Sequence, residues 1–524
     1  MEAEVKASKA KAKKARQDTT RKQIRGSSLL LTGRFLSVGL NFVSQVLMVR
    51  YLSQTDYGAY AYALSVVAFF HGLSSLGLRR GITRFIPIYH EREEYEKLTG
   101  TLVLTLGTIA VTAVLIIGAI HLWPEQVARL VKDKSQPIHL LLILIFMVPV
   151  EAIDGLLVAL FASFASPRAI FFRKFVVAPG LKLLVVVLLI AFQSSVVFLA
   201  YGYLAASALG VLFFIWLLFR MLKQQGVLQH LRLKTMEIPA KEIFAFTIPL
   251  LTSDLVTIVM HSADTMLLGY FHGTTQVAAF RAILPAAHFN KIPMMSFAIL
   301  YTPLAARLFA RDDYKGINDL YWRTAIWMCV LSFPIFALTF SLAKPLTLFL
   351  YGARYESSWI YMHLFALGYY FNVALGFNGL TLKVLGKVRY VVILNIAASL
   401  LNLLLAFLLI PKYGALGAAI ATTASMILHN VFKQAGLKLA AGISIFDWRY
   451  FSFYLLLMAG AVGLFLIQFW TTQNVYVLVP LAAGFSLLLF LAARDKLRIE
   501  ETFPELLKIP VLKSIFKWKL PKLK

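Results

Sequence analysis

The chain is a succession of long apolar segments separated by short polar breaks. Each segment has about the 20 residues that a helix needs to cross a hydrocarbon core about 30 Å thick. Lipid offers no hydrogen bonds to backbone N–H and C=O groups, so segments that cross it must be helical. Only 15% of the residues are charged, and the mean hydropathy is +0.74. These values exclude a soluble globular protein, and the sequence predicts an all-α polytopic membrane protein.

Fourteen apolar segments have membrane length. We predict transmembrane helices at about 28–49, 57–78, 99–122, 138–163, 171–192, 196–219, 243–269, 277–304, 322–342, 358–382, 390–410, 414–437, 450–470 and 474–493. This arrangement puts both termini on one side of the membrane, together with most of the lysines and arginines. Because basic residues concentrate in cytoplasmic loops, we expect a plasma (inner) membrane protein with both termini in the cytoplasm.

The formal net charge of +27 would suggest a nucleic-acid partner if the protein were soluble. Here the basic residues follow the membrane topology instead, so no nucleic-acid partner is predicted. Two interpretations stay open for the lysine-rich tails at 1–26 and 494–524. The tails either bind an anionic membrane leaflet or serve only to fix the orientation of the chain.

Two stretches recur in the second half of the chain. VRYLSQTDYGAY at 49–60 is echoed by LGYFHGTTQVAAF at 268–280, and segment 165–189 is echoed by 386–410. Six spans per half give both halves the same orientation, so a substrate site is expected between them near the midplane. The predicted domains are a basic cytoplasmic tail (1–26), an N-terminal six-helix bundle (27–222), a basic cytoplasmic linker (223–242), a C-terminal six-helix bundle (243–440), two accessory helices (441–493) and a second basic cytoplasmic tail (494–524).

Several polar and basic residues lie inside the predicted spans and share helix faces. In the first span the spacing i, i+7, i+11 aligns three side chains, and in the eighth span i, i+7, i+10 aligns three more. Charged groups are costly in lipid and usually face a cavity or a partner. We predict a cavity for an anionic substrate lined by Arg34, Asn41, Gln45, Lys182, Arg281, His288 and Lys291.

Carboxylates and one further histidine in the spans are candidates for binding a proton or a sodium ion. This set comprises Glu151, Asp154, Asp254, His261 and Asp264. The alternative interpretation is structural, with internal ion pairs such as Arg34 with Asp254, or Glu151 and Asp154 with Lys174 or Lys182. Basic side chains near span ends could also extend to the interface.

Known enzyme and cofactor signatures are absent from the sequence. It has no GxxxxGK[ST] phosphate loop and no HExxH motif, and its one cysteine, Cys329, allows no internal disulfide or cysteine metal cluster. No cofactor, metal or ATP-driven pump is predicted, and we do not expect an enzyme. A membrane-embedded transferase needs no soluble domain and stays an alternative.

Three stretches carry a resemblance to a known family. They are VRYLSQTDYGAYAYALSV (49–66), LSSLGLRRGITRFIPIY (73–89) and LGKVRYVVILNIAASLLNLLLAFLLIPKYGALGAAIAT (385–422). These stretches resemble Wzx-type polysaccharide flippases of the multidrug/oligosaccharidyl-lipid/polysaccharide (MOP) exporter superfamily. The resemblance covers about 27–493 and leaves out both tails.

The resemblance implies two six-helix bundles forming a V around a central cavity, plus two accessory helices. The implied activity is alternating-access transfer of a polyprenyl-pyrophosphate-linked oligosaccharide from the inner to the outer leaflet, for export of a cell-surface polysaccharide. Implied partners are this lipid-linked substrate, membrane lipids and polysaccharide-assembly enzymes. Ion gradients or the membrane potential would drive turnover.

Three other functions stay open. The chain could be an ion-coupled drug or metabolite exporter of the same superfamily, although four basic residues in the spans favour an anionic cargo. A membrane-embedded polysaccharide polymerase or ligase usually carries a large outer loop, and the longest outer loops here, about 123–137 and 343–357, are short. A scaffold without transport activity is the last alternative.

Overall fold

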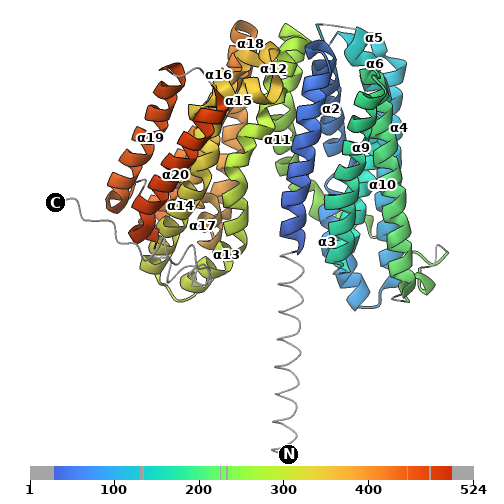
Figure 1. The fold of residues 1–524 in the computed structure, drawn as a ribbon. Helices are drawn as coiled ribbons and strands as arrows, with labels where there is room; N and C mark the ends of the chain where they lie inside the picture. Colours follow the sequence, from blue (N-terminus) through green and yellow to red (C-terminus); the bar gives the residue numbers. More distant parts are fainter. Residues whose placement is uncertain are drawn as a thin grey trace, which may run out of the picture. The chain divides into compact units, whose positions relative to one another are not determined.

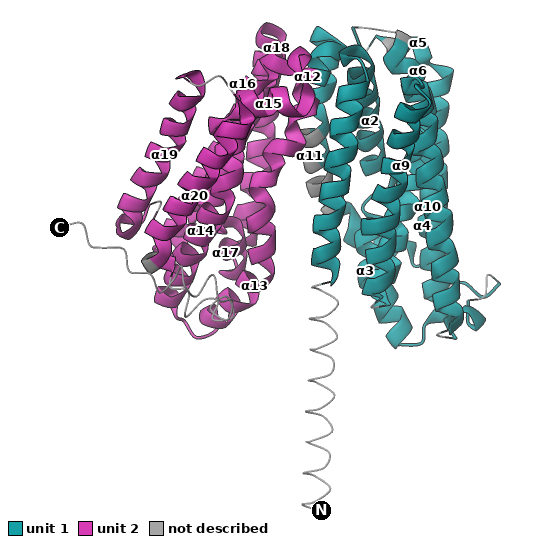
Figure 2. Ribbon diagram, in the orientation of Figure 1, with its two compact units in different colours: residues 1–278 teal, residues 279–524 magenta. Residues whose placement is uncertain are grey.

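A computed structural model describes residues 29–497 except 130, 133–134, 165, 225, 232–233, 445 and 471–473. The chain divides into two compact units, Met1–Ala278 and Ala279–Lys524 (Figure 2). The boundary between the units falls one helix later in the chain than the predicted start of the second bundle at 243. The division into six-helix bundles, the V and the accessory pair stay predictions.

The described part of unit 1 consists of helices joined by short turns, and its long helices run side by side (Figure 1). Its helices are Leu29–Tyr51, α2 (Gln54–Ser74), α3 (Leu78–Glu91), α4 (Tyr95–Leu122), α5 (Pro124–Ala128), α6 (Ser135–Leu144), α7 (Met147–Ser163), α8 (Pro167–Ile170), η1 (Phe171–Val177), α9 (Ala178–Ala191), α10 (Val196–Gln224), η2 (Val227–Gln229) and α11 (Ala240–His272).

Helix α12 (Thr274–His288) crosses the boundary between the units. The remaining helices are η3 (Phe289–Lys291), α13 (Ile292–Phe309), α14 (Tyr314–Phe336), η4 (Ala337–Ser341), α15 (Ala343–Tyr351), η5 (Ala353–Ser358), α16 (Trp359–Ala374), α17 (Asn378–Val384), α18 (Val388–Ala441), η6 (Trp448–Tyr450), α19 (Phe451–Trp470) and α20 (Val475–Leu497).

The all-α membrane class is confirmed. The described residues contain 10 helices long and apolar enough to cross a membrane, or up to 12 if each bent pair forms one span. Each of the predicted spans falls on a helix or a bent pair, because α18 holds two of them and α11 covers 243–269. The number of segments that cross the bilayer stays a prediction.

The second span is broken near its middle. Helices α2 and α3 meet at a bend of 42°, where Leu76 and Gly77 have φ of 41° and 71°. The break frees backbone carbonyl groups, and one of them, that of Ser74, accepts a hydrogen bond from Thr112 Oγ1 at 3.0 Å. The predicted span ended at 78, so α3 and the arginines it carries were wrongly assigned to a loop.

The motif at 49–60 is a helix start held by close packing. Ser53 caps α2, since its Oγ accepts the N–H of Asp56 at 3.0 Å. Gly58 follows, and a Cβ added there would lie 1.9 Å from the carbonyl oxygen of Thr274. Thr274 lies in the segment 268–280, which echoes this motif. The motif and its echo therefore pack closely against each other within unit 1.

The motif at 410–417 is a turn between two antiparallel helix segments. Within α18, Gly414 has non-helical angles of φ 56° and ψ −131°, and beyond it the chain folds back. Tyr390 OH donates to the carbonyl of Phe432 at 2.8 Å. A Cβ on Gly417 would lie 2.4 Å from the carbonyl oxygen of Leu409. Gly414 provides the backbone conformation of the tight turn, and Gly417 leaves room for the backbone that folds back beside it.

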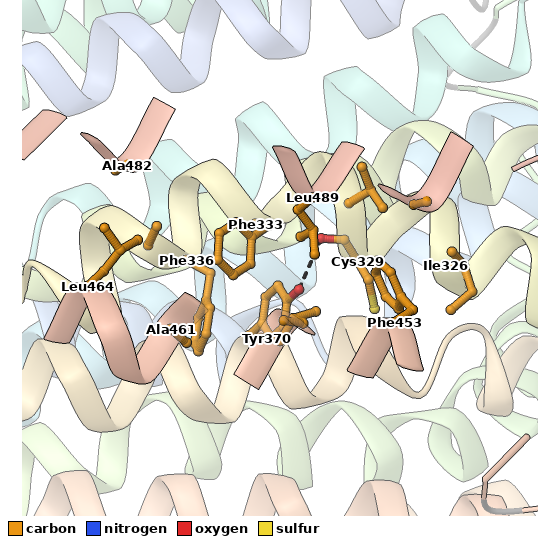
Figure 3. Packing of buried hydrophobic residues seen from close by; sticks show 14 of the residues in the cluster. Ile326, Cys329, Phe333, Phe336, Tyr370, Phe453, Ala461, Leu464, Ala482 and Leu489 are labelled. Carbon is orange, nitrogen blue, oxygen red and sulfur yellow. Dashed lines mark hydrogen bonds between the residues drawn. The ribbon is translucent and has the colours of Figure 1, made fainter. Parts of the chain in front are cut away.

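The core of unit 2 is rich in aromatic rings. Phe336 stacks on Tyr370 with ring centroids 4.0 Å apart, and Tyr370 OH donates to the backbone carbonyl of Cys329 at 3.0 Å (Figure 3). Cys329 itself is a fully buried free thiol. The single cysteine is therefore a packed side chain.

We expect Gly58→Ala to lower the thermal stability of the purified protein, because the new methyl group would meet a backbone oxygen that cannot move alone. Overpacking of this kind costs about 1–3 kcal/mol. Gly107→Ala is the matched control, since nothing lies within 4 Å of its added Cβ and alanine favours a helix. Equal melting temperatures for the two variants would contradict the packing role of Gly58.

Candidate functional site

Two adjoining hollows lie within unit 1. The first has a volume of about 330 Å³ and is lined by α2, α3, α7 and α11. The second has about 250 Å³ and is lined mainly by α7, η1, α9 and α10. Both share His71, Arg79 and Gly155 in their linings. We call the two together the unit 1 cavity.

The unit 1 cavity has a cationic lining. Among its described lining residues, five basic side chains and one histidine accompany two carboxylates: Arg79, Arg80, Arg173, Lys174, Lys182 and His71, with Glu151 and Asp154. Three of these residues, Lys182, Glu151 and Asp154, were predicted from the sequence as site residues. The remaining lining consists of aliphatic side chains, glycines and serines. A lining with this excess of cations suits a multiply charged anion.

The break between α2 and α3 brings two arginines to this cavity. Gly77 adopts a left-handed conformation and packs near the carbonyl oxygen of Thr247, 3.2 Å from its would-be Cβ. Arg79 and Arg80 follow on the first turn of α3. On the facing helix α7, Gly155 leaves room for Arg79, whose Cδ lies 3.8 Å from the position of an added Cβ.

Arg173 is held by three groups at once. Its guanidinium lies 2.8 Å from a carboxylate oxygen of Asp154, and its Nε donates to the carbonyl of Gly210 at 2.7 Å. It also lies over the ring of Phe214, 5.8 Å from the centroid. Its side chain is only 4% exposed, so this ion pair joins α7, η1 and α10. Asp154 is therefore in a structural ion pair, with Arg173 and not with Lys174 or Lys182.

The π-helix η1 carries two adjacent basic residues, Arg173 and Lys174, which have different surroundings. A π turn inserts an extra residue and rotates the side chains that follow. Arg173 is buried in its ion pair, whereas Lys174 lines the cavity within electrostatic reach of Asp154, Arg79 and Arg34. The first helix approaches η1 closely, since a Cβ on Gly33 would lie 2.6 Å from the ring of Phe171.

The other part of the cavity adjoins a group of tyrosines. Lys182 Nζ lies 5.5 Å from the ring centroid of Tyr203, which meets Tyr60 edge to face at 5.6 Å. Gln45 donates from Nε2 to Tyr57 OH at 3.0 Å. Gln45 and these tyrosines are not among the residues that line the unit 1 cavity, so a role for Gln45 in lining a substrate cavity stays a prediction.

The remaining predicted residues of unit 1 lie elsewhere. Arg34 and Asn41 are exposed on the first helix, and Asn41 Nδ2 donates locally to the carbonyl of Ser37 at 2.8 Å. Asp264 is buried on α11 at 6% exposure. The side chains of Asp254 and His261 lie outside the described residues. None of these residues is among those that line the unit 1 cavity.

The predicted residues of the eighth span flank the break between α12 and α13. Lys291 Nζ lies 4.3 Å from the ring centroid of Tyr369, and the ring of His288 lies 4.5 Å from the same ring. Arg281 is half-buried one turn into unit 2. A cavity shared by these residues and those of unit 1 stays a prediction.

Sequence reasoning missed five residues of the unit 1 cavity: His71, Arg79, Arg80, Arg173 and Lys174. Two of them follow a helix break that apolar periodicity does not reveal. Arg173 and Lys174 fall at the start of the predicted span 171–192, and only Lys174 was considered there, as an ion-pair partner and not as a site residue. A pair of adjacent arginines directly after a Leu-Gly-Leu stretch was the available signal, since glycine there can end one helix and start another.

Comparisons with known proteins place the chain in a family. The family described as "Polysaccharide biosynthesis protein" matches residues 24–302, more than half of the chain. The chain belongs to this family. A second family, MatE, matches residues 249–408, and together the matches confirm the resemblance to the MOP superfamily.

Relatives of the chain are distant in sequence. Stage V sporulation protein B of Bacillus subtilis is 22% identical over 466 residues, covering 84% of this chain and 88% of that protein. An uncharacterized membrane protein of Methanocaldococcus jannaschii is 20% identical over 428 residues, covering 79% and 83%. A putative O-antigen transporter of Shigella flexneri is 23% identical over 195 residues, 37% of this chain and 46% of that protein.

Solved structures share the fold. The lipid II flippase MurJ in an inward closed conformation superposes with a TM-score of 0.68 at 16% identity, covering 90% of this chain and 100% of that one. An inward-facing multidrug resistance MATE transporter of the MOP superfamily gives a TM-score of 0.63 at 14% identity, covering 77% and 94%. The chain is thus a MOP-superfamily transporter by family and fold.

We expect Asp154→Asn to destabilise the protein, because it leaves the buried Arg173 guanidinium without its counter-charge. Removing one partner of a buried ion pair costs about 3–5 kcal/mol. Thermal unfolding in detergent would measure the loss, with Glu151→Gln as the control, since Glu151 is in no ion pair among the described residues. If both variants melt alike, the structural role of Asp154 is wrong.

Proposed function

We propose that this protein is a flippase that moves a polyprenyl-pyrophosphate-linked oligosaccharide from the inner to the outer leaflet, for export of a cell-surface polysaccharide. The observation that carries the proposal is the excess of basic side chains in the unit 1 cavity. Membership of the polysaccharide biosynthesis family supports this choice of cargo.

The cavity chemistry matches the head of such a substrate. A pyrophosphate in lipid would lose its hydration, and arginine and lysine donors replace it with charge-assisted hydrogen bonds. Arg79 has no carboxylate partner among the described residues, so its guanidinium is available for a phosphate. Sugars would meet the polar side chains nearby, and the prenyl tail would stay in the bilayer.

Turnover proceeds by alternating exposure of the cargo site to the two sides of the membrane. The energy comes from an ion gradient or the membrane potential. Glu151 lines the cavity near Lys182 without an ion pair in the described residues, so it is our candidate for carrying the coupling proton or cation. In this proposal the protein is not an enzyme, lies in the inner membrane with cytoplasmic termini, and works beside polysaccharide-assembly enzymes.

Export of a drug or metabolite is the second candidate. It is favoured by the MatE match at residues 249–408 and by the MATE transporters that share the fold. A cationic drug would need carboxylates that are not already paired, and in the unit 1 cavity Asp154 is bound to Arg173. The charge balance of the lining therefore favours the anionic cargo.

We expect Arg79→Gln and Lys174→Gln to reduce flipping about ten-fold each, since a hydrogen bond to a charged group contributes about 1.5–3 kcal/mol. Arg311→Gln, at an exposed turn after α13, should leave transport unchanged. Each variant is introduced into cells lacking the native protein. Mass spectrometry of lipid extracts then measures the lipid-linked oligosaccharide that accumulates.

A deletion strain whose lipid-linked pool stays unchanged, but which becomes sensitive to cationic dyes, would refute the flippase and favour the exporter. If Arg79→Gln and Lys174→Gln both transport normally while the deletion does accumulate substrate, the unit 1 cavity is not the cargo site.

A further inference from the structure

A second group of basic side chains lies in unit 2. It consists of Lys383 on α17 with His429 and Lys433 on α18, and we call it the unit 2 basic cluster. His429 and Lys433 are four residues apart and share one helix face. Lys433 crosses to α17, where its ammonium lies 3.5 Å from the position of a Cβ added to Gly379. The cluster shares no residue with the unit 1 cavity.

The cluster holds like charges without a counter-charge. Lys383 acts on Lys433 electrostatically, and Lys433 acts in turn on His429. Within the part of the chain that the structure describes, no carboxylate pairs with either lysine. Lys433 is half-buried, whereas Lys383 is exposed. The partial burial of the Lys433 ammonium and its repulsion from Lys383 are costly, and a bound anion would offset that cost.

Polar groups beneath the cluster hold its geometry. His429 Nε2 lies 2.9 Å from Asn395 Oδ1 across the two segments of α18. Asn378 at the start of α17 donates to Asn430 Oδ1 at 3.2 Å, and Asn372 of α16 donates to the same oxygen at 2.8 Å. These amides fix α17 to α18, so Lys383 and Lys433 are brought together by a rigid frame.

Apolar side chains flank the cluster on the exposed surface of α18. Leu428 and Phe432 precede His429 and Lys433 by one residue each, and they are 39% and 49% exposed. Exposed apolar side chains on a helix of membrane length are suited to contact acyl chains. An anion bound to the lysines would therefore have lipid tails beside it.

We propose that the unit 2 basic cluster binds a phosphate group, supplied by the headgroup of an anionic phospholipid or by free inorganic phosphate. The apolar row favours the phospholipid, whose acyl chains would lie along Leu428 and Phe432. Basic residues at a membrane surface commonly bind lipids in this way. The site is independent of the transport proposal, since it requires no cargo in the unit 1 cavity.

The test uses the full-length protein in neutral detergent. Native mass spectrometry counts the bound phosphatidylglycerol, with diacylglycerol of the same acyl chains as the phosphate-free probe. Lys433→Gln and Lys383→Gln should each retain about five-fold less phosphatidylglycerol, as expected for a loss of about 1 kcal/mol per basic residue. Lys438→Gln is the matched control, exposed on the same helix, and Lys433→Arg should keep the lipid.

Thermal unfolding separates binding from misfolding. Without phosphate, Lys433→Gln should melt at or above the temperature of the wild type, because the substitution removes a repelling charge. With phosphatidylglycerol, or with inorganic phosphate at matched ionic strength, only the wild type should gain stability. A gain with phosphate alone would identify free phosphate as the ligand. Equal lipid retention and equal phosphate response in the wild type and both glutamine variants would overturn the site.

Discussion

Hydrocarbon solvates neither a free backbone group nor a lone charge, so both must find partners within the protein. Two irregular points of unit 1 show such partners. Where α2 ends, Thr112 takes up the freed carbonyl of Ser74. Where η1 widens to a π turn, Arg173 of that turn is paired with Asp154 and with the carbonyl of Gly210. The break after α2 is thus placed where a side chain takes up a freed carbonyl, and residues at both irregular points line the unit 1 cavity.

The charged side chains at the unit 1 cavity are of two kinds, those in an ion pair and those without one among the described residues. Arg173 and Asp154 satisfy each other and join three helices, so they contribute to architecture more than to recognition. Arg79 and Lys174 stand at the same cavity without such a partner among the described residues. A paired charge has little left to offer a ligand, whereas an unpaired one is stabilised by binding an anion. The distinction depends on geometry, since the sequence does not show which of these four charged residues are paired.

The sequence predicted the helices well because apolar length is a one-dimensional property. It predicted the cavity only in part. Lys182 and Glu151 were found because they interrupt apolar runs, but Arg79 was missed because the left-handed turn at Gly77 is invisible to periodicity. Face alignment within the first helix was also insufficient, since Asn41 bonds locally to Ser37. Sequence spacing shows which side chains share a face, but not what that face meets.

The glycines in the motifs that resemble the family serve helix packing and turns. Gly58 is required by the carbonyl of Thr274, and Gly414 and Gly417 by a tight helix turn. These contacts involve backbone atoms, and none of these glycines lines the unit 1 cavity. Among the lining side chains, Arg173 and Asp154 also hold helices together, whereas Arg79 and Lys174 are in no ion pair among the described residues. The chain shares its fold with MurJ at 16% identity, so the shared packing does not identify the cargo, which has to be inferred from the cavity lining.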